Sequence, residues 1–207
     1  MTKEQETPVV REEPAVRGAL CDASYGADWV LLPAMRTRAW GYADLVNERA
    51  NTAETRFATA SAGKAFIAAS IMHLIEAGKL DLYPLFADRP AVPDTEGTFR
   101  YNNSGYVLLG RILESVTGEV FDQWLGRNLF LPAGMTRTGY YELDRLPQGC
   151  AYSYIEDGEG GWYTNIYSVD VKDTGAGGAF TTVTDIARFW EFLLRGTFLS
   201  AATVSQM

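Results

Sequence analysis

The sequence predicts an α+β fold in which a helical lobe lies beside a small antiparallel sheet. Apolar residues recur at helical spacing through the middle of the chain, and short stretches rich in aromatic and β-branched residues lie near its start and after residue 150. Of the 207 residues, 47% are hydrophobic and 21% are charged. This composition is sufficient to bury one sizeable core or two small lobes.

The first part of the chain is expected to be a tail followed by strands. Residues 1–18 mix charged side chains with prolines, and such a segment buries too little surface to become ordered. Two short extended stretches follow, WVLL at 29–32 and RTRAWGYADL at 36–45. Pro33 separates them.

The middle of the chain is expected to be mainly helical. Apolar spacing predicts a helix from Ser61 to Ala77, and Gly78 follows where a left-handed C-cap belongs. Prolines over 81–99 predict an irregular connection. Two further helices are predicted in the same way, over 104–117 before Gly118 and over 120–129 before Pro132.

A hairpin and a glycine-rich loop are expected before the last helices. Strand-like stretches at 151–155 (AYSYI) and 162–169 (WYTNIYSV) flank the turn sequence EDGEGG. After the loop GAGGAF at 175–180, Thr184 is the expected N-cap of an amphipathic helix that ends at Gly196. We therefore predict a disordered tail and one domain over 19–207, divided into strands (19–60), mainly helices (61–150), the hairpin and glycine-rich loop (151–183) and helices (184–207).

Charge and hydropathy limit the partners. The chain has 18 Lys plus Arg against 26 Asp plus Glu, a net charge of −8 that repels nucleic acid and anionic lipid. No apolar run is long enough to span a membrane, and the start lacks the apolar stretch of a secretion signal. We expect no nucleic-acid partner and a cytoplasmic location for the chain as given, or a periplasmic or secreted one if the start was trimmed.

Cysteine and histidine content limits the chemistry. Cys21 and Cys150 could form one disulfide, but such sparse cysteines are more typical of small buried apolar residues. The single histidine, His73, lies in an apolar helical pattern and is expected to be structural. A zinc site usually needs three or four protein ligands, so no zinc site is expected.

The first chemical motif is Ser61-Ala62-Gly63-Lys64, at the start of the first predicted helix. At this spacing the serine hydroxyl and the lysine amine project from one face of a helical turn. A lysine can activate a serine by accepting its proton, and a helix N-terminus offers backbone N–H groups to a developing oxyanion. The alternative is an ordinary helix start beside a solvated lysine.

The second motif is Tyr101-Asn102-Asn103, directly before the second predicted helix. A tyrosine beside a lysine ammonium can act as a proton shuttle, and an amide can orient a substrate. The alternative is an N-cap asparagine, Asn102 or Asn103, with a tyrosine that only packs.

The surroundings of both motifs resemble a known family. The stretches TRFATASAGKAFIAASIMHLIEAGKLDL, GTFRYNNSGYVLLGRILESVTGEVFDQWLGRNLFLPAGMTRTGY and GGAFTTVTDIARFWEFLLRG are similar to the serine β-lactamase and penicillin-binding-protein superfamily, in its class C-type β-lactamase, esterase and D-aminopeptidase branch. The resemblance implies a multi-domain β-lactamase/transpeptidase-like fold. It also implies acyl transfer through an acyl-serine on a β-lactam, ester or D-amino-acid peptide, without metal or cofactor.

The resemblance also assigns roles. Ser61 is the implied nucleophile, Lys64 its activating partner, Tyr101 the second general acid/base and Asn103 the substrate-orienting amide. The partner is then a small-molecule or peptide substrate.

The chain departs from the family pattern in two places before its end. Gly63 stands where relatives commonly have Ser or Thr, and a glycine is expected to loosen the turn that aims Ser61. Relatives also have a longer stretch after the first helix, whereas here Leu82 runs directly into Tyr83 and Pro84. This connection is expected to be shortened.

The third family motif, Lys/His-x-Gly on a strand beside the active site, has no match in the 207 residues, so the C-terminal strands of the sheet are expected to be missing. The apolar face around Phe66, Ile67 and Ile71 would then need another cover, such as a homo-oligomeric partner, a rearranged fold or an exposed patch. Two functions follow as alternatives: a serine hydrolase, or a catalytically impaired fragment that acts as a binding or assembly module.

Overall fold

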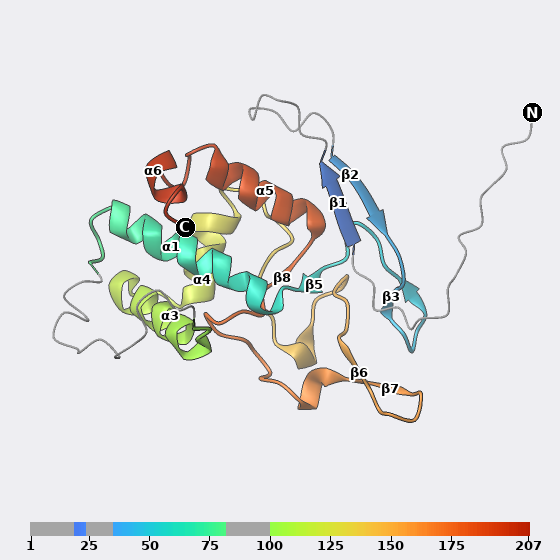
Figure 1. The fold of residues 1–207 in the computed structure, drawn as a ribbon. Helices are drawn as coiled ribbons and strands as arrows, with labels where there is room; N and C mark the ends of the chain where they lie inside the picture. The colour runs from blue at the N-terminus through green and yellow to red at the C-terminus, as the bar shows by residue number, and fades with distance from the viewer. Residues whose placement is uncertain (1–18, 24–34, 82–99) are drawn as a thin grey trace, which may run out of the picture.

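The structure is a computed structural model that describes residues 19–23, 35–81 and 100–207. Within these ranges the helices gather in one lobe, and short strands lie at its side (Figure 1). The α+β prediction is confirmed. The expected tail and the stretch 29–32 lie outside the described residues, as do residues 82–99 of the expected irregular connection.

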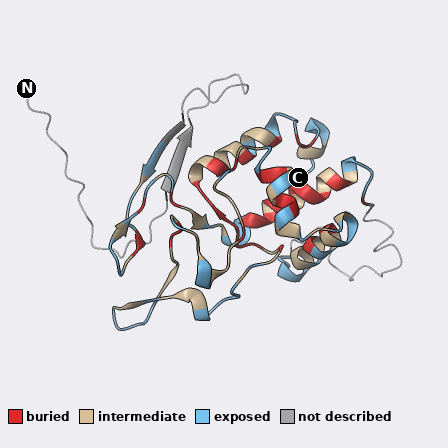
Figure 2. Cartoon of the chain, turned by 180° about the vertical axis from the view of Figure 1, so that it is seen from behind, coloured by how far each residue is buried: buried red, intermediate tan, exposed pale blue. Residues whose placement is uncertain are grey.

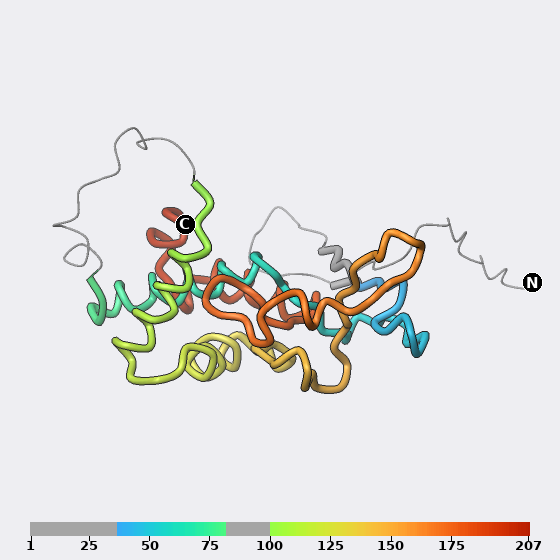
Figure 3. Tube along the Cα trace, turned by 90° about the horizontal axis from the view of Figure 1, so that it is seen from below, coloured from blue at the N-terminus to red at the C-terminus, as the bar shows by residue number. Residues whose placement is uncertain are grey.

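The described strands form four two-stranded antiparallel sheets. The pairs are β1 (Ala19–Ala23) with β2 (Met35–Ala39), β3 (Tyr42–Asp44) with β4 (Arg49–Ala50), β5 (Phe57–Ala58) with β8 (Phe180–Thr181), and β6 (Tyr154–Glu156) with β7 (Trp162–Thr164). The predicted stretch 36–45 overlaps β2 and contains β3, and the predicted hairpin is β6–β7, which Figure 3 shows as a protruding loop. Both sequence predictions are confirmed, with shorter strands.

The first predicted helix consists of two parts. A 3-10 turn, η1 (Ala60–Gly63), leads into α1 (Lys64–Glu76), and Gly78 has the predicted left-handed conformation with φ 65°. The predicted helix is confirmed, but its first turn, which contains Ser61, is 3-10 helical. The left-handed backbone of Ala60 directs the chain into a tight turn, in which Ala62 N donates to the Thr59 carbonyl at 3.0 Å.

The two middle helices follow the prediction closely. Helix α3 (Asn103–Thr117) ends at Gly118, whose φ is 70°. Helix α4 (Phe121–Leu125) continues into a π-helical turn, η2 (Gly126–Phe130), so only the first half of the segment 120–129 is α-helical.

The last helices are α5 (Val183–Leu194) and α6 (Ala201–Val204). The N-cap of α5 is Thr182 and not Thr184, because β8 ends at Thr181 and the Thr182 hydroxyl accepts a hydrogen bond from Asp185 N at 3.1 Å. Two short 3-10 turns complete the described elements, η3 (Leu143–Arg145) and η4 (Asn165–Tyr167).

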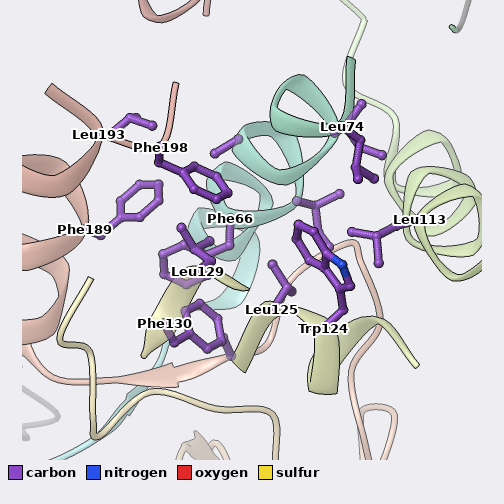
Figure 4. Packing of buried hydrophobic residues seen from close by; sticks show 14 of the residues in the cluster. Phe66, Leu74, Leu113, Trp124, Leu125, Leu129, Phe130, Phe189, Leu193 and Phe198 are labelled. Atoms are coloured by element: carbon purple, nitrogen blue, oxygen red, sulfur yellow. The ribbon is translucent and has the colours of Figure 1, made fainter. Parts of the chain in front are cut away.

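The core lies where α1, α3, α4, η2 and α5 meet. Figure 4 shows their apolar side chains converging, and Figure 2 shows burial concentrated on the inward faces of the helices. Phe66, Ile67 and Ile71 are at most 3% exposed. The cover that the sequence analysis expected for this face comes from the chain itself, because Phe130, Phe189 and other residues of the same chain bury it.

The structure describes the side chains of Cys150 and His73. Cys150 is a free thiol and is buried, and burial raises its pKa. The structure does not describe the side chain of Cys21. His73 stacks on Phe198 at 4.3 Å between ring centroids, and its Nδ1 lies 2.9 Å from the Phe198 carbonyl, as expected of a structural histidine.

Candidate active site

The buried ammonium of Lys64 is the centre of the site. Its side chain comes from the first turn of α1, and the residue is 8% exposed. Nζ donates to Ser61 Oγ at 3.1 Å, to Tyr101 Oη at 2.7 Å and to the Ala176 carbonyl. An ammonium has three donors, so each proton of Lys64 has an acceptor.

Ser61 lies in η1, where the chain passes from β5 into α1, and its residue is exposed. Its hydroxyl oxygen also accepts a hydrogen bond from Tyr101 Oη at 2.5 Å. The two groups that can exchange a proton with Ser61 therefore contact the same oxygen and each other.

Tyr101 reaches this pair from the segment before α3. It is 58% exposed, so it is not a core aromatic. The hydrogen bond from Lys64 lowers the pKa of Tyr101, and the hydrogen bond to Ser61 lowers it further. Lys64 Nζ also lies 4.9 Å from the centroid of the Tyr101 ring.

The two asparagines of the second motif have different positions. Asn102 is the N-cap of α3, and its side chain accepts from Gly105 N at 2.9 Å. Asn103 is the first helical residue and is exposed, so its amide is available beside Tyr101. Of the two predicted alternatives for the cap, the structure assigns Asn102.

Ala176 is a member of the site that the sequence analysis did not predict. Its carbonyl accepts from Lys64 and belongs to residues 175–178 (Gly-Ala-Gly-Gly), which we call the glycine strap. The composition of this loop was visible in the sequence. A backbone carbonyl has no residue-type signature, however, and therefore could not be assigned from the sequence.

A cavity of about 220 Å³ lies between α3, the start of α4 and residues 172–175. Four charged groups of its wall form two ion pairs: Lys172 Nζ lies 2.6 Å from Asp122 Oδ2, and Arg111 Nη1 lies 2.8 Å from Glu114 Oε2. The cavity is adjacent to the strap through Gly175.

Comparison with known proteins identifies the family. The sequence profile of the Beta-lactamase family matches residues 34–84 and 85–207. The chain belongs to the Beta-lactamase family. The break in this match falls between residues 84 and 85, where the sequence predicts a shortened connection.

Two curated relatives of this family are from Bacillus subtilis (strain 168). The chain is 25% identical over 214 residues to PbpX, which is named as a penicillin-binding protein, covering 82% of this chain and 54% of that protein. It is 33% identical over 115 residues to penicillin-binding protein 4*, covering 50% of this chain and 25% of the relative. The chain thus spans about half the length of the first relative and a quarter of the second.

Solved structures of the family share the fold. A penicillin-binding protein from Bacillus halodurans superposes with a TM-score of 0.76 at 29% identity, covering 90% of this chain and 71% of that one. D-amino acid amidase from Ochrobactrum anthropi SV3 gives a TM-score of 0.66 at 23% identity, covering 84% of this chain and 65% of that one. An octameric penicillin-binding protein homologue from Pyrococcus abyssi gives 0.66 at 21%, covering 84% and 53%.

Two further findings concern the described residues. None of their helices is long and apolar enough to cross a membrane. They also contain no group of three or more His, Cys, Asp or Glu side chains that could hold a metal ion.

Proposed function

We propose that the chain is a serine hydrolase in which Ser61 attacks a carboxylic acid derivative and forms an acyl-serine that water then hydrolyses. The observation that carries this proposal is the contact of Ser61 Oγ with both Lys64 Nζ and Tyr101 Oη, at 3.1 and 2.5 Å. A serine hydroxyl is a weak nucleophile until a neighbouring base accepts its proton.

Tyr101 and Lys64 together are the proposed base. Lys64 donates to the phenol oxygen at 2.7 Å and so favours its deprotonated form. In the first step the Ser61 oxygen bonds to the substrate carbonyl carbon, and the Ser61 proton moves to Tyr101. When the tetrahedral intermediate collapses, the bond to the leaving group breaks and the leaving nitrogen or oxygen takes that proton.

The second step reverses these roles for water. Water attacks the acyl-serine carbonyl, gives a proton to Tyr101, and the proton returns to Ser61 as the acid product leaves. The backbone N–H of Ser61, near the start of η1, is the proposed donor to the oxyanion. The exposed amide of Asn103, next to Tyr101 at the start of α3, is the proposed substrate-orienting group.

The proposed substrates are β-lactams, esters or D-amino-acid peptides. Relatives named as penicillin-binding proteins make a β-lactam the first probe. The family's Lys/His-x-Gly motif does not occur in the 207 residues, so acylation is the step to measure before turnover.

The test is covalent labelling of the purified 207-residue chain. Incubation with a fluorescent penicillin or a fluorophosphonate, followed by intact mass and peptide mapping, should give one adduct on Ser61. Ser61→Ala should remove the adduct. Ser205→Ala changes an exposed serine of the C-terminal segment and should leave labelling unchanged.

The alternative function predicts a different result. A binding or assembly module would bind the β-lactam reversibly without any covalent adduct at Ser61, even at millimolar probe. That outcome would overturn the proposed hydrolase.

A further inference from the structure

The glycine strap contacts the turn that carries Ser61 through its backbone. Gly178 N donates to the Ala60 carbonyl at 3.0 Å. Directly beside it, Thr59 N donates to the Ala179 carbonyl at 2.7 Å. The residue before Ser61 is therefore held by the strap, while Ala176 accepts from Lys64.

Ala60 has an unusual backbone conformation. Its φ is 45°, in the left-handed region where a side chain with a Cβ is disfavoured. Strained residues of this kind persist only where the surrounding structure holds them, and they cluster at functional sites. Here the strained residue directly precedes Ser61, and the strap supplies the contacts that hold it.

The approach of the strap to Ala60 requires a glycine at position 177. A Cβ on Gly177 would lie 2.3 Å from the Ala60 carbonyl oxygen and 2.8 Å from its carbonyl carbon. Both atoms belong to the backbone, so they cannot rotate away as a side chain would. Gly63 also lies near the strap, but a Cβ there would be 3.4 Å from Gly177 Cα, which is an ordinary van der Waals contact.

We propose that the glycine strap is a positioning element for acyl transfer, in which Gly177 allows the strap to fix the turn at Ala60 and Ser61 while Ala176 fixes Lys64. One four-residue segment then sets the separation between the serine hydroxyl and the lysine amine through two independent backbone contacts. This inference rests on the proposed function, because positioning has a consequence only if Ser61 is acylated.

The central experiment compares two glycine-to-alanine changes. Gly177→Ala places a methyl group against the Ala60 carbonyl, whereas Gly126→Ala has nothing within 4 Å and a helical φ of −53°. We expect Gly177→Ala to lower the maximal rate of Ser61 acylation by at least tenfold, with a smaller change in the half-saturating probe concentration. Gly126→Ala should stay within twofold of the wild-type chain.

A second substitution tests the same contact from the other side. Ala60→Gly combined with Gly177→Ala should recover part of the lost rate, because a glycine at 60 lets the carbonyl move without strain. A folded Gly177→Ala chain that is acylated within twofold of wild type would overturn the inference.

If circular dichroism shows that Gly177→Ala does not fold, the acylation rate of the single variant Ala60→Gly tests the inference instead. A glycine at position 60 relieves the strain of φ 45°, but it also lets the residue before Ser61 adopt other backbone conformations. Acylation should therefore slow at least threefold, while the midpoint of thermal unfolding is unchanged or higher. Acylation at the wild-type rate would overturn the inference.

A readout without activity separates this inference from the proposed function. Tyrosine labelled with ¹³C at Cζ reports the titration of Tyr101, assigned with Tyr101→Phe. We expect Gly177→Ala to move the pKa of Tyr101 back towards its usual value, since Lys64 is no longer held against the phenol. If wild-type Ser61 is not labelled, the proposed function fails, and an unchanged Tyr101 titration in Gly177→Ala would then overturn the positioning role as well.

Discussion

Lys64 and Tyr101 show at the scale of single residues how the site is arranged. The lysine uses its donors on a hydroxyl, a phenol and a backbone carbonyl, and Ser61 Oγ accepts from both the lysine and the tyrosine. For Ser61 to lose its proton, one of these two donors must first become an acceptor. The lowered pKa of Tyr101 makes the phenol the group to test.

Tyr101→Phe should remove the pH dependence of acylation. Because the pKa of Tyr101 is below its usual value of 10, the phenolate forms on raising the pH through a midpoint below 10, so the acylation rate should rise with pH and fall as the pH drops. Loss of a general base typically costs about 10²–10⁴-fold in rate. The measurement is acylation rate against pH, with Tyr163→Phe on the exposed strand β7 as control. If the acylation rate of Tyr101→Phe increased with pH as it does in the wild-type chain, Tyr101 would be excluded as the base.

Asp185→Ala should destabilise the chain strongly. Asp185 is 0% exposed, and its carboxylate accepts from Arg137 N at 2.8 Å, Thr138 Oγ1 at 2.9 Å and Arg188 Nη1 at 3.0 Å. Alanine removes three hydrogen bonds to a carboxylate, and a hydrogen bond to a charged group contributes about 1.5–3 kcal/mol. Urea unfolding measures the loss, and Asp144→Ala at an exposed site should change the free energy of unfolding by less than about 0.5 kcal/mol. Equal effects of the two changes would contradict this account.

At the scale of elements, the glycines near the two ends of α1, Gly63 and Gly78, have different backbone conformations. Gly63 has φ −61° and ψ −15°, which alanine adopts readily, and it is buried. The nearest obstacle to a Cβ there is Thr59 Oγ1, at 2.7 Å, and this hydroxyl can rotate. Gly78 has φ 65°, which alanine adopts only with strain.

Gly63→Ala and Gly78→Ala should therefore have opposite effects on stability. Gly63→Ala should raise the free energy of unfolding by about 0.4–1 kcal/mol, because alanine reduces the freedom of the unfolded chain. Gly78→Ala should lower it by about 1–2 kcal/mol. Urea unfolding of the two variants and the wild-type chain gives the sign of each change in the free energy of unfolding. Destabilisation by Gly63→Ala would mean that Thr59 cannot rotate and that the turn requires glycine.

The elements also show what the sequence could predict and why the rest escaped it. Ser61, Lys64 and Tyr101 were predicted from two motifs at helix starts together with the family resemblance of their surroundings, and the structure brings their side chains into contact. The cap of α5 was misplaced, because Thr182 and Thr184 are equally good caps until the end of β8 fixes where the helix begins. Ala176 escaped because it contributes a backbone carbonyl, and its position depends on how the strap crosses the turn before α1.

At the scale of the whole molecule, one core connects the helices and supports the site. Phe66 is in α1, and its ring lies edge-on to Phe130 of η2 at 5.2 Å and to Phe189 of α5 at 4.9 Å between centroids. Lys64 is only two residues before Phe66, so the packing of this ring also fixes the first turn of α1. The stability of the core and the geometry of the site are thereby linked.

Phe66→Ala should remove much of the stability of the chain. Deleting a buried phenylalanine side chain costs about 3–5 kcal/mol, against a total of about 5–15 kcal/mol for a typical domain. Phe66→Leu keeps most of the volume and should cost less than about 1.5 kcal/mol, whereas Leu131→Ala, at 64% exposure, should change little. Urea unfolding followed by circular dichroism gives the three values. A loss below about 1 kcal/mol for Phe66→Ala would mean that α1 is not anchored by this cluster, because an anchored ring cannot be deleted without leaving a cavity between α1, η2 and α5.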